Sequence, residues 1–145
     1  MTRPKSLLVV EDEFLIRDLI QTALEDAGFS AIIVGHGGEA MQLLGTDGLT
    51  ISALITDVGL GDGPDGWALA RAARRLRPQL PVIYLSGRDG HEWPSQGVPN
   101  SAFLQKPLTI SQIVAAAHAV IDAPLNWLPG PRSAAQPGGP IFTSL

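Results

Sequence analysis

The feature that most constrains this chain is a series of short apolar runs that alternate with longer stretches of helical periodicity. Five runs are expected to be strands, at residues 6–10, 30–34, 51–56, 81–86 and 102–105. Short continuous apolar runs are typical of strands buried on both faces, and their alternation with helices indicates βα units. The sequence therefore predicts an α/β fold with a five-stranded parallel sheet.

Four of the segments between and after these strands predict regular helices. The first carries an apolar stripe and ends before Gly28, which suits the position just past a helix end. That stripe comprises Leu15, Ile16, Leu19, Ile20, Ala23, Leu24 and Ala27. Further helices are expected at 38–44, at 66–76 with Leu69, Ala73 and Leu76 inward, and from an N-cap at Thr109 to Pro124, with Ile110, Ile113, Val114, Ala117 and Ile121 in its apolar stripe. Segment 87–100 holds two prolines and three glycines, so a fourth helix is expected to be short or missing.

The length and composition predict one domain, residues 1–123, followed by a tail, residues 124–145. The tail carries five prolines, three glycines and a single charged side chain, Arg132, so it is expected to be disordered. An alternative is that its apolar residues Trp127, Phe142 and Leu145 anchor a partner or pack on the domain.

Charge and residue usage exclude several classes of function. A net charge of −4 argues against direct nucleic-acid binding, and we interpret the arginines at 71, 74, 75 and 77 as the solvated face of one helix. The absence of cysteine excludes disulfides and thiol chemistry. The apolar run near the amino terminus is too short for a secretory signal or a membrane span, so we expect a cytoplasmic protein without membrane insertion.

Polar side chains stand at the carboxyl ends of four predicted strands. Glu11 and Asp12 follow the first, Asp57 ends the third, Ser86 ends the fourth and Lys106 follows the fifth. Open α/β sheets place their chemistry at this edge. Crowded carboxylates favour a hard cation, and Mg²⁺ binds a few carboxylate oxygens together with water and phosphate oxygens. We therefore predict that Glu11 and Asp12 are metal ligands, that Asp57 is an oxygen nucleophile, and that Lys106 and Ser86 contact a phosphoryl group.

This arrangement, scattered over residues 5–123, resembles the receiver domain of two-component response regulators. The resemblance implies a doubly wound, flavodoxin-like sheet of order 2-1-3-4-5 and phosphorylation of Asp57 with Mg²⁺. It also implies that the backbone carbonyl of Gly59 contributes to the metal site and that Lys106-Pro107 is a cis peptide. By the same likeness, Phe103 is a switch residue whose ring rotates when Ser86 moves toward the phosphate. The other interpretation of Phe103 is a core ring that does not move.

The resemblance also implies partners and a role. The phosphoryl donor would be a sensor histidine kinase or a histidine phosphotransfer protein, docked on the face that carries Arg17, Gln21 and Glu25. A stand-alone receiver of this kind would signal by binding an unknown downstream protein. It would not be an enzyme beyond catalysing its own phosphorylation and slow dephosphorylation.

Two other classes of function remain open from the sequence. A Mg²⁺-dependent phosphohydrolase of the haloacid dehalogenase type also uses a strand-end aspartate, but such enzymes resemble Asp-x-Asp, and Gly59 stands at the second position. A receiver-shaped interaction module would need no phosphate. Several neighbouring residues have simpler structural interpretations: Glu13 as a first-turn helix acid, Asp62 and Asp65 as turn and cap residues, and Trp93 as a packing residue unless it is exposed.

Overall fold

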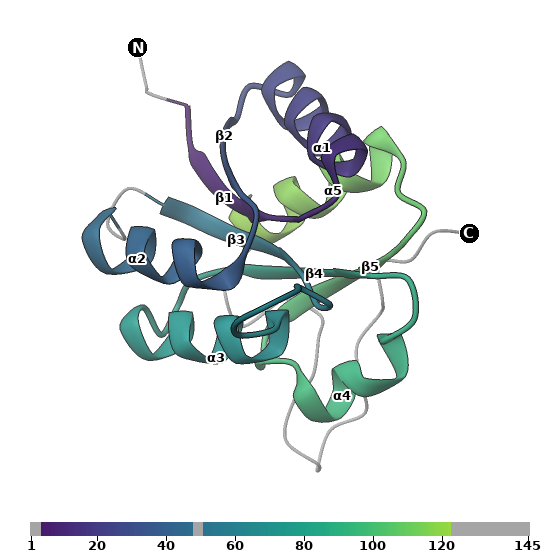
Figure 1. Cartoon of the computed structure of the whole chain (residues 1–145). Coiled ribbons are helices and arrows are strands. Elements are labelled where there is room, and N and C mark those ends of the chain that lie inside the picture. Colours follow the sequence, from purple (N-terminus) through teal and green to yellow (C-terminus); the bar gives the residue numbers. More distant parts are fainter. Residues whose placement is uncertain (1–3, 48–50, 123–145) are drawn as a thin grey trace.

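The fold is a five-stranded parallel sheet of order β2-β1-β3-β4-β5 (Figure 1). This computed structural model describes residues 4–47 and 51–122. The strands are β1 (Ser6–Val10), β2 (Ser30–Val34), β3 (Ile51–Asp57), β4 (Val82–Ser86) and β5 (Ser101–Gln105). The predicted fold class and strand order are confirmed. The predicted tail and its boundary at residue 123 lie outside the described residues.

Helices cover both faces of the sheet, with α1 (Phe14–Asp26) and α5 (Ile110–Asp122) on one side. On the other side lie α2 (Gly37–Asp47), α3 (Gly66–Leu76) and α4 (Trp93–Gln96). The predicted end of α1 and start of α5 are confirmed. Gly28, just past the end of α1, has a φ of +94°, and Thr109, the residue before α5, accepts at its Oγ1 a hydrogen bond from Gln112 N–H at 3.2 Å. Asp65 caps α3 by accepting from Ala68 N–H at 2.9 Å, as predicted.

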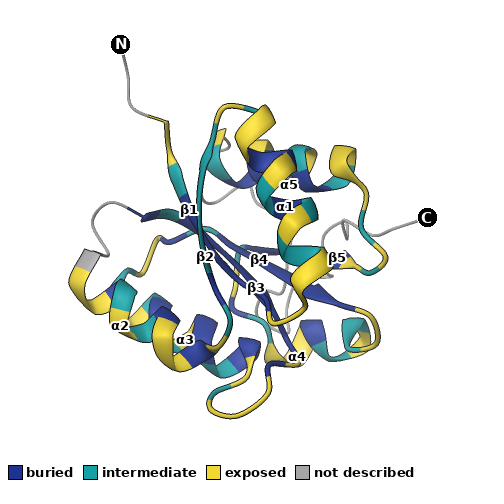
Figure 2. Cartoon of the chain, turned by 45° about the horizontal axis from the view of Figure 1, so that its top comes forward, coloured by how far each residue is buried: buried dark blue, intermediate teal, exposed yellow. Residues whose placement is uncertain are grey.

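The two faces of the sheet bury different kinds of side chain. Under α1 and α5 every fully buried member of the core is aliphatic, among them Ile20, Leu24 and Ile83, and we call this side the aliphatic face. Under α2, α3 and α4 the core includes four large rings, and we call this side the aromatic face. These rings are Trp67, Tyr84, Trp93 and Phe103. Figure 2 shows β1, β3, β4 and β5 mostly buried between the layers, the edge strand β2 mostly half-buried, and the outer sides of the helices exposed.

The fourth helix is short, as predicted, and the segment around it is held by polar contacts instead. Helix α4 has four residues and follows a single 3₁₀ turn at Gly90–Glu92. Arg74 of α3 donates to the carbonyl oxygens of Leu80, Pro99 and Asn100 at 2.6, 2.7 and 3.0 Å. The prediction that these arginines form the solvated face of one helix is therefore wrong for Arg74, which is half-buried and donates to backbone carbonyls. It is also wrong for Arg77, which lies past the end of α3, is half-buried and donates to the carbonyl of Ile51.

Buried aromatic residues also fix the segment between α4 and β5. The Trp93 indole N–H donates to Ser101 Oγ at 3.0 Å, and Tyr84 Oη accepts from the backbone N–H of Val98 at 3.0 Å. Trp93 is only 3% exposed, so it is a packing residue, and the alternative of an exposed partner-binding tryptophan is wrong.

Three residues predicted on apolar helix stripes are exposed. Leu15 is 79% exposed, Leu76 52% and Ile110 50%. Leu15 and Ile110 lie in the first turns of α1 and α5, and Leu76 is the last residue of α3. Helical periodicity places these residues on the inward side, but the end turns of these helices are not fully covered by the core.

The start of α3 lies directly against the end of β3. Gly66 N–H donates to the carbonyl of Val58 at 2.8 Å, which closes the loop 59–65 at its base. A Cβ atom at Gly66 would lie 2.2 Å from the carbonyl oxygen of Asp57, closer than real Cβ contacts. Glycine is therefore required here because of close backbone approach.

Candidate functional site

Charged side chains from three strand ends meet at the carboxyl edge of the sheet. Lys106 Nζ lies 2.9 Å from Glu11 Oε1 and 3.4 Å from Asp57 Oδ2. Glu11 is completely buried, and Asp57, the last residue of β3, is 7% exposed. The parallel strands bring these residues together because each strand ends at the same edge.

The backbone fixes each of these side chains. Glu11 N–H donates to the carbonyl of Val34 at 3.1 Å, and Glu11 Oε2 accepts from Glu13 N–H at 3.1 Å. Lys106 N–H donates to the carbonyl of Ser86 at 2.9 Å, and the peptide bond from Lys106 to Pro107 is cis, as the resemblance implied. Backbone hydrogen bonds to neighbouring strands therefore fix the positions from which the Glu11 and Lys106 side chains enter the site.

Burial shifts the protonation of this group. Burial raises the pKa of Glu11 to about 7, against the opposing effect of Lys106. Burial also raises the pKa of Asp57, and the negative charge of Asp12 adds to that rise, while Lys106 opposes it. For Lys106 burial alone would lower the pKa, but the contacts with Glu11 and Asp57 outweigh it and the pKa is raised. One cation thus partly offsets several carboxylates.

Three acidic residues could hold a divalent metal ion. One carboxylate oxygen each from Glu11, Asp12 and Asp57 lie within 4.8 Å of one another. Asp12 is exposed, whereas the other two are buried, so the group opens toward solvent on one side. Oxygen ligands of this kind fit Mg²⁺, and a bound cation would offset the repulsion and burial that raise the pKa values of Glu11 and Asp57. The residues present therefore fit the metal.

A hollow of about 400 Å³ lies beside Asp57 and is lined by polar groups from several loops. Its lining comprises Glu13, Asp57, Gly59, Ser86, Gly87, Arg88, Asp89 and Lys106. The backbone of Gly59 lowers the pKa of Asp57, against the effect of burial. Glu13 lines this hollow and is the N-cap residue of α1, one position before the first turn in which the sequence analysis placed it, and its side chain makes no cap hydrogen bond.

Asp89 is a residue of this hollow that the sequence analysis did not single out. Its Oδ2 accepts from the Ser86 hydroxyl at 2.8 Å. The only signal available in the sequence was an acidic residue three positions after a strand-end serine, and in a Gly-rich loop such a residue is ordinarily a turn former.

The predicted switch residue lies one layer deeper. Phe103 is 1% exposed, and its ring centroid lies 6.0 Å from that of Trp93. A Cβ atom at Gly90 would lie 3.2 Å from Phe103 Cε1, so the loop after Ser86 packs directly on this ring.

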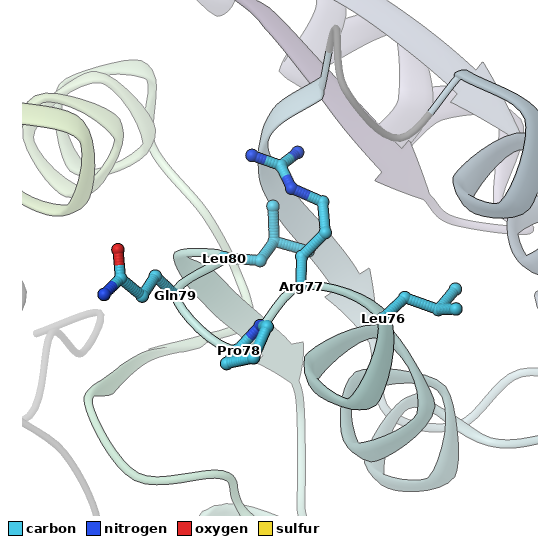
Figure 3. Close-up of a pocket in the computed structure, with 5 residues that line it drawn as sticks. All are labelled: Leu76, Arg77, Pro78, Gln79 and Leu80. Carbon is cyan, nitrogen blue, oxygen red and sulfur yellow. The ribbon is translucent and has the colours of Figure 1, made fainter.

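Another hollow, of about 440 Å³, lies at the turn between α3 and β4 (Figure 3). It is at the amino end of β4, the opposite edge of the sheet from Asp57. In Figure 3 Leu76, Pro78 and Gln79 point away from one another, and Arg77 donates to the carbonyl of Ile51. Its lining side chains do not converge on a common point, so the carboxyl edge is the candidate site.

Comparison with known proteins identifies the family. Residues 7–118 match the family described as the response regulator receiver domain. The chain belongs to this family. A crystal structure of a response regulator receiver protein from Sinorhizobium medicae is 36% identical, has a TM-score of 0.78, and matches over 83% of this chain and 96% of that one.

Curated relatives of this receiver domain are longer proteins. Transcriptional regulatory protein PmrA of Pectobacterium parmentieri is 33% identical over 117 residues, which is 79% of this chain and 51% of PmrA. A putative NtrX-like response regulator of Rickettsia felis is 30% identical over 111 residues and is matched over only 23% of its length. The chain thus spans between about a quarter and a half of these two relatives.

The family match separates the receiver class from the phosphohydrolase class. The protein is a receiver domain of the kind used by response regulators in two-component systems, and the phosphohydrolase alternative is not favoured. Phosphorylation on aspartate with Mg²⁺ is typical of the family. Among the described residues, no helix is both long and apolar enough to cross a membrane.

Proposed function

We propose that this receiver domain accepts a phosphoryl group on Asp57 with Mg²⁺, and that the phosphorylated form binds a downstream protein. The observation that carries the proposal is the contact of Asp57 with Lys106 beside two further carboxylates at an open hollow. Glu11, Asp12, Asp57 and the backbone carbonyl of Gly59 would hold Mg²⁺. When bound, the ion supplies positive charge that offsets the charge of an incoming phosphoryl group.

The chain's own side chains would each have a defined part in the transfer. A carboxylate oxygen of Asp57 forms the new bond to phosphorus while the bond from phosphorus to the donor breaks. The electron pair of that bond leaves on the imidazole nitrogen of a phosphohistidine, or on the acetate oxygen of acetyl phosphate. Lys106 exchanges its contact with Asp57 for one with a phosphoryl oxygen, and Ser86 donates to another.

The donor would be a histidine kinase or a histidine phosphotransfer protein that docks beside this hollow. Phe14 and Leu15, 71% and 79% exposed, begin α1, and Ile110, 50% exposed, begins α5. Both helices begin at the carboxyl edge of the sheet, the edge that also carries Asp57, so a donor docked there would meet these exposed apolar side chains. The predicted polar contacts lie further along α1, where Gln21 Nε2 donates to Glu25 Oε2 at 3.2 Å.

Docking and chemistry can be separated by the choice of donor. Leu15→Glu is expected to reduce transfer from a phosphohistidine protein about tenfold, since it removes an apolar contact and adds a charge. Phosphorylation by acetyl phosphate, which needs no docking face, should be unchanged. Equal transfer from the protein donor to Leu15→Glu and to the unaltered chain would contradict this docking face.

The phosphoacceptor itself is tested by mass spectrometry after incubation with acetyl phosphate and Mg²⁺. The unaltered chain is expected to gain one phosphoryl group, mapped to Asp57, and Asp57→Asn to gain none. Asp62→Asn is the matched control because Asp62 is an exposed acid in the loop 59–65. Failure to detect an adduct or to bind beryllofluoride would favour a phosphate-independent interaction module, and rapid turnover of phosphate esters would favour a hydrolase.

A further inference from the structure

The hydroxyl of Ser86 uses its whole hydrogen-bonding capacity within the loop that follows it. It donates to Asp89 Oδ2 at 2.8 Å and accepts from the backbone N–H groups of Arg88 and Asp89 at 3.2 and 3.0 Å. A serine hydroxyl has one proton to donate and two lone pairs to accept. The single proton of Ser86 is therefore committed to Asp89.

The acceptor of that proton is a carboxylate on the rim of the hollow beside Asp57. Ser86 is 2% exposed, Asp89 is half-buried, and both line this hollow with Asp57 and Lys106. Hydrogen bonds to an ionised acceptor are shorter and stronger than those to a neutral one. A phosphoryl oxygen on Asp57 could receive the Ser86 proton only if Asp89 gave it up.

We propose that Asp89 is a positioning residue that holds the Ser86 hydroxyl in the unphosphorylated arrangement and competes with the phosphoryl group for its proton. This inference rests on the proposed phosphorylation of Asp57. Asp89 thereby weakens retention of the phosphoryl group. It also sets how far phosphorylation shifts the equilibrium between the unphosphorylated and the phosphorylated conformation of the domain. On phosphorylation the Ser86 hydroxyl keeps its proton but donates its hydrogen bond to a phosphoryl oxygen in place of Asp89 Oδ2, so Asp89 loses its contact.

The contacts of the next residues connect this exchange to the aromatic face. Gly90 follows Asp89 and packs on the ring of Phe103, where a Cβ atom would lie 3.2 Å from Cε1. Phe103 in turn contacts Trp93, whose indole N–H donates to Ser101. Release of Asp89 frees the segment that covers Phe103, so the exchange at Ser86 reaches the α4 region through direct packing.

Beryllofluoride binding in the presence of Mg²⁺ measures the competition. Asp89→Asn keeps the size of the side chain but makes the acceptor neutral, and it is expected to bind beryllofluoride about fivefold more tightly. Asp89→Ala removes the acceptor altogether and is also expected to bind beryllofluoride more tightly than the unaltered chain. The control Glu92→Gln removes one charge from the adjacent 3₁₀ turn, and its side chain forms no hydrogen bond or ion pair with the described residues.

A double-mutant cycle distinguishes this role from simple charge repulsion. If Asp89 acts through Ser86, Asp89→Asn changes affinity by less than about twofold in a Ser86→Ala background. A fivefold gain that persists without the Ser86 hydroxyl would overturn the inference, because Asp89 would then act by charge alone. Affinity of Asp89→Asn equal to that of the unaltered chain would overturn it too.

A second readout needs neither metal nor phosphate. In metal-free Asp89→Asn, the amide signals of residue 88 and the Trp93 indole signal should move toward their positions in the beryllofluoride-bound unaltered chain. Shifts in any other direction would indicate a merely structural role and would overturn the inference. Absence of beryllofluoride binding in all variants would instead overturn the proposed function, and this inference with it.

Discussion

The two faces of the sheet are built on different principles. On the aliphatic face two helices of 13 residues each pack on aliphatic side chains, and the fully buried residues of that core have no polar atoms beyond the backbone. On the aromatic face two of the rings also form hydrogen bonds. Tyr84 Oη accepts from the backbone N–H of Val98, and the Trp93 indole N–H donates to Ser101 Oγ.

The two kinds of packing place different constraints on the two sides of the sheet. Aliphatic packing is non-directional and requires mainly the right volume. A hydrogen bond from a buried ring fixes orientation and leaves a buried group unsatisfied if it breaks. Ser86, Tyr84 and Phe103 belong to the aromatic face or adjoin it, so a change at the site can be transmitted as an exchange of discrete partners.

The largest effect on stability is expected from truncating the aliphatic face. Ile83 of β4 is fully buried there, so Ile83→Ala should lower the free energy of unfolding by about 3 kcal/mol, measured by urea denaturation. Beryllofluoride affinity and the Trp93 indole signal should stay as in the unaltered chain. A displaced indole signal would break the comparison, since it would show that the aliphatic face also controls the α4 region.

A smaller effect is expected from pH, and it tests whether the carboxylates at the sheet edge contribute separately from either face. Folding raises the pKa of Glu11 from 4.5 to about 7, so the folded chain holds this proton more tightly than the unfolded chain. The resulting stability is complete below pH 4.5 and is lost as pH rises through 7. Metal-free protein should lose about 2 kcal/mol between pH 5 and pH 7.

Urea denaturation at several pH values, with a chelator present, measures this loss. Glu11→Gln should remove most of the slope, leaving the part due to Asp57, whose raised pKa acts in the same direction. Glu92→Gln, in the 3₁₀ turn at Gly90–Glu92, is the control and should keep the pH dependence of stability. An unchanged slope in Glu11→Gln would assign the pH dependence elsewhere.

The smallest effect is expected next to Ile83 in sequence but on the other face. Tyr84→Phe leaves the backbone N–H of Val98 without its acceptor and should cost about 1–2 kcal/mol. Unlike Ile83→Ala, it should shift the amide signals of residues 97–101 and the Trp93 indole signal. The comparison would be sharpened if the smaller loss of stability produced the larger spectral change, and contradicted if residues 97–101 did not respond.

Much of this fold could be predicted because strands buried on both faces read as apolar runs. The predicted limits of β3, β4 and β5 differ by one residue from those observed. The meeting of Glu11, Asp57 and Lys106 was also predictable, since parallel strands bring their carboxyl ends to one edge. Their roles in phosphorylation remain predictions.

Features that depend on irregular backbone could not be predicted in the same way. Periodicity places Arg74 on α3, but it does not show that its guanidinium reaches the carbonyls of Pro99 and Asn100. The bond from Ser86 to Asp89 depends on the path of a Gly-rich loop. The exposure of Leu15 depends on where the core ends, which no local pattern records.

The tight closure at the base of the loop 59–65 has a practical consequence for engineering. Its ends are pinned because Gly66 donates to Val58 and lies against the carbonyl of Asp57, whereas Gly61, Asp62 and Gly63 are exposed. A short foreign peptide grafted between Asp62 and Gly63 would therefore be displayed next to the candidate site without displacing Asp57. The loop offers an insertion point for a reporter or an affinity tag, provided that residue 66 stays without a side chain.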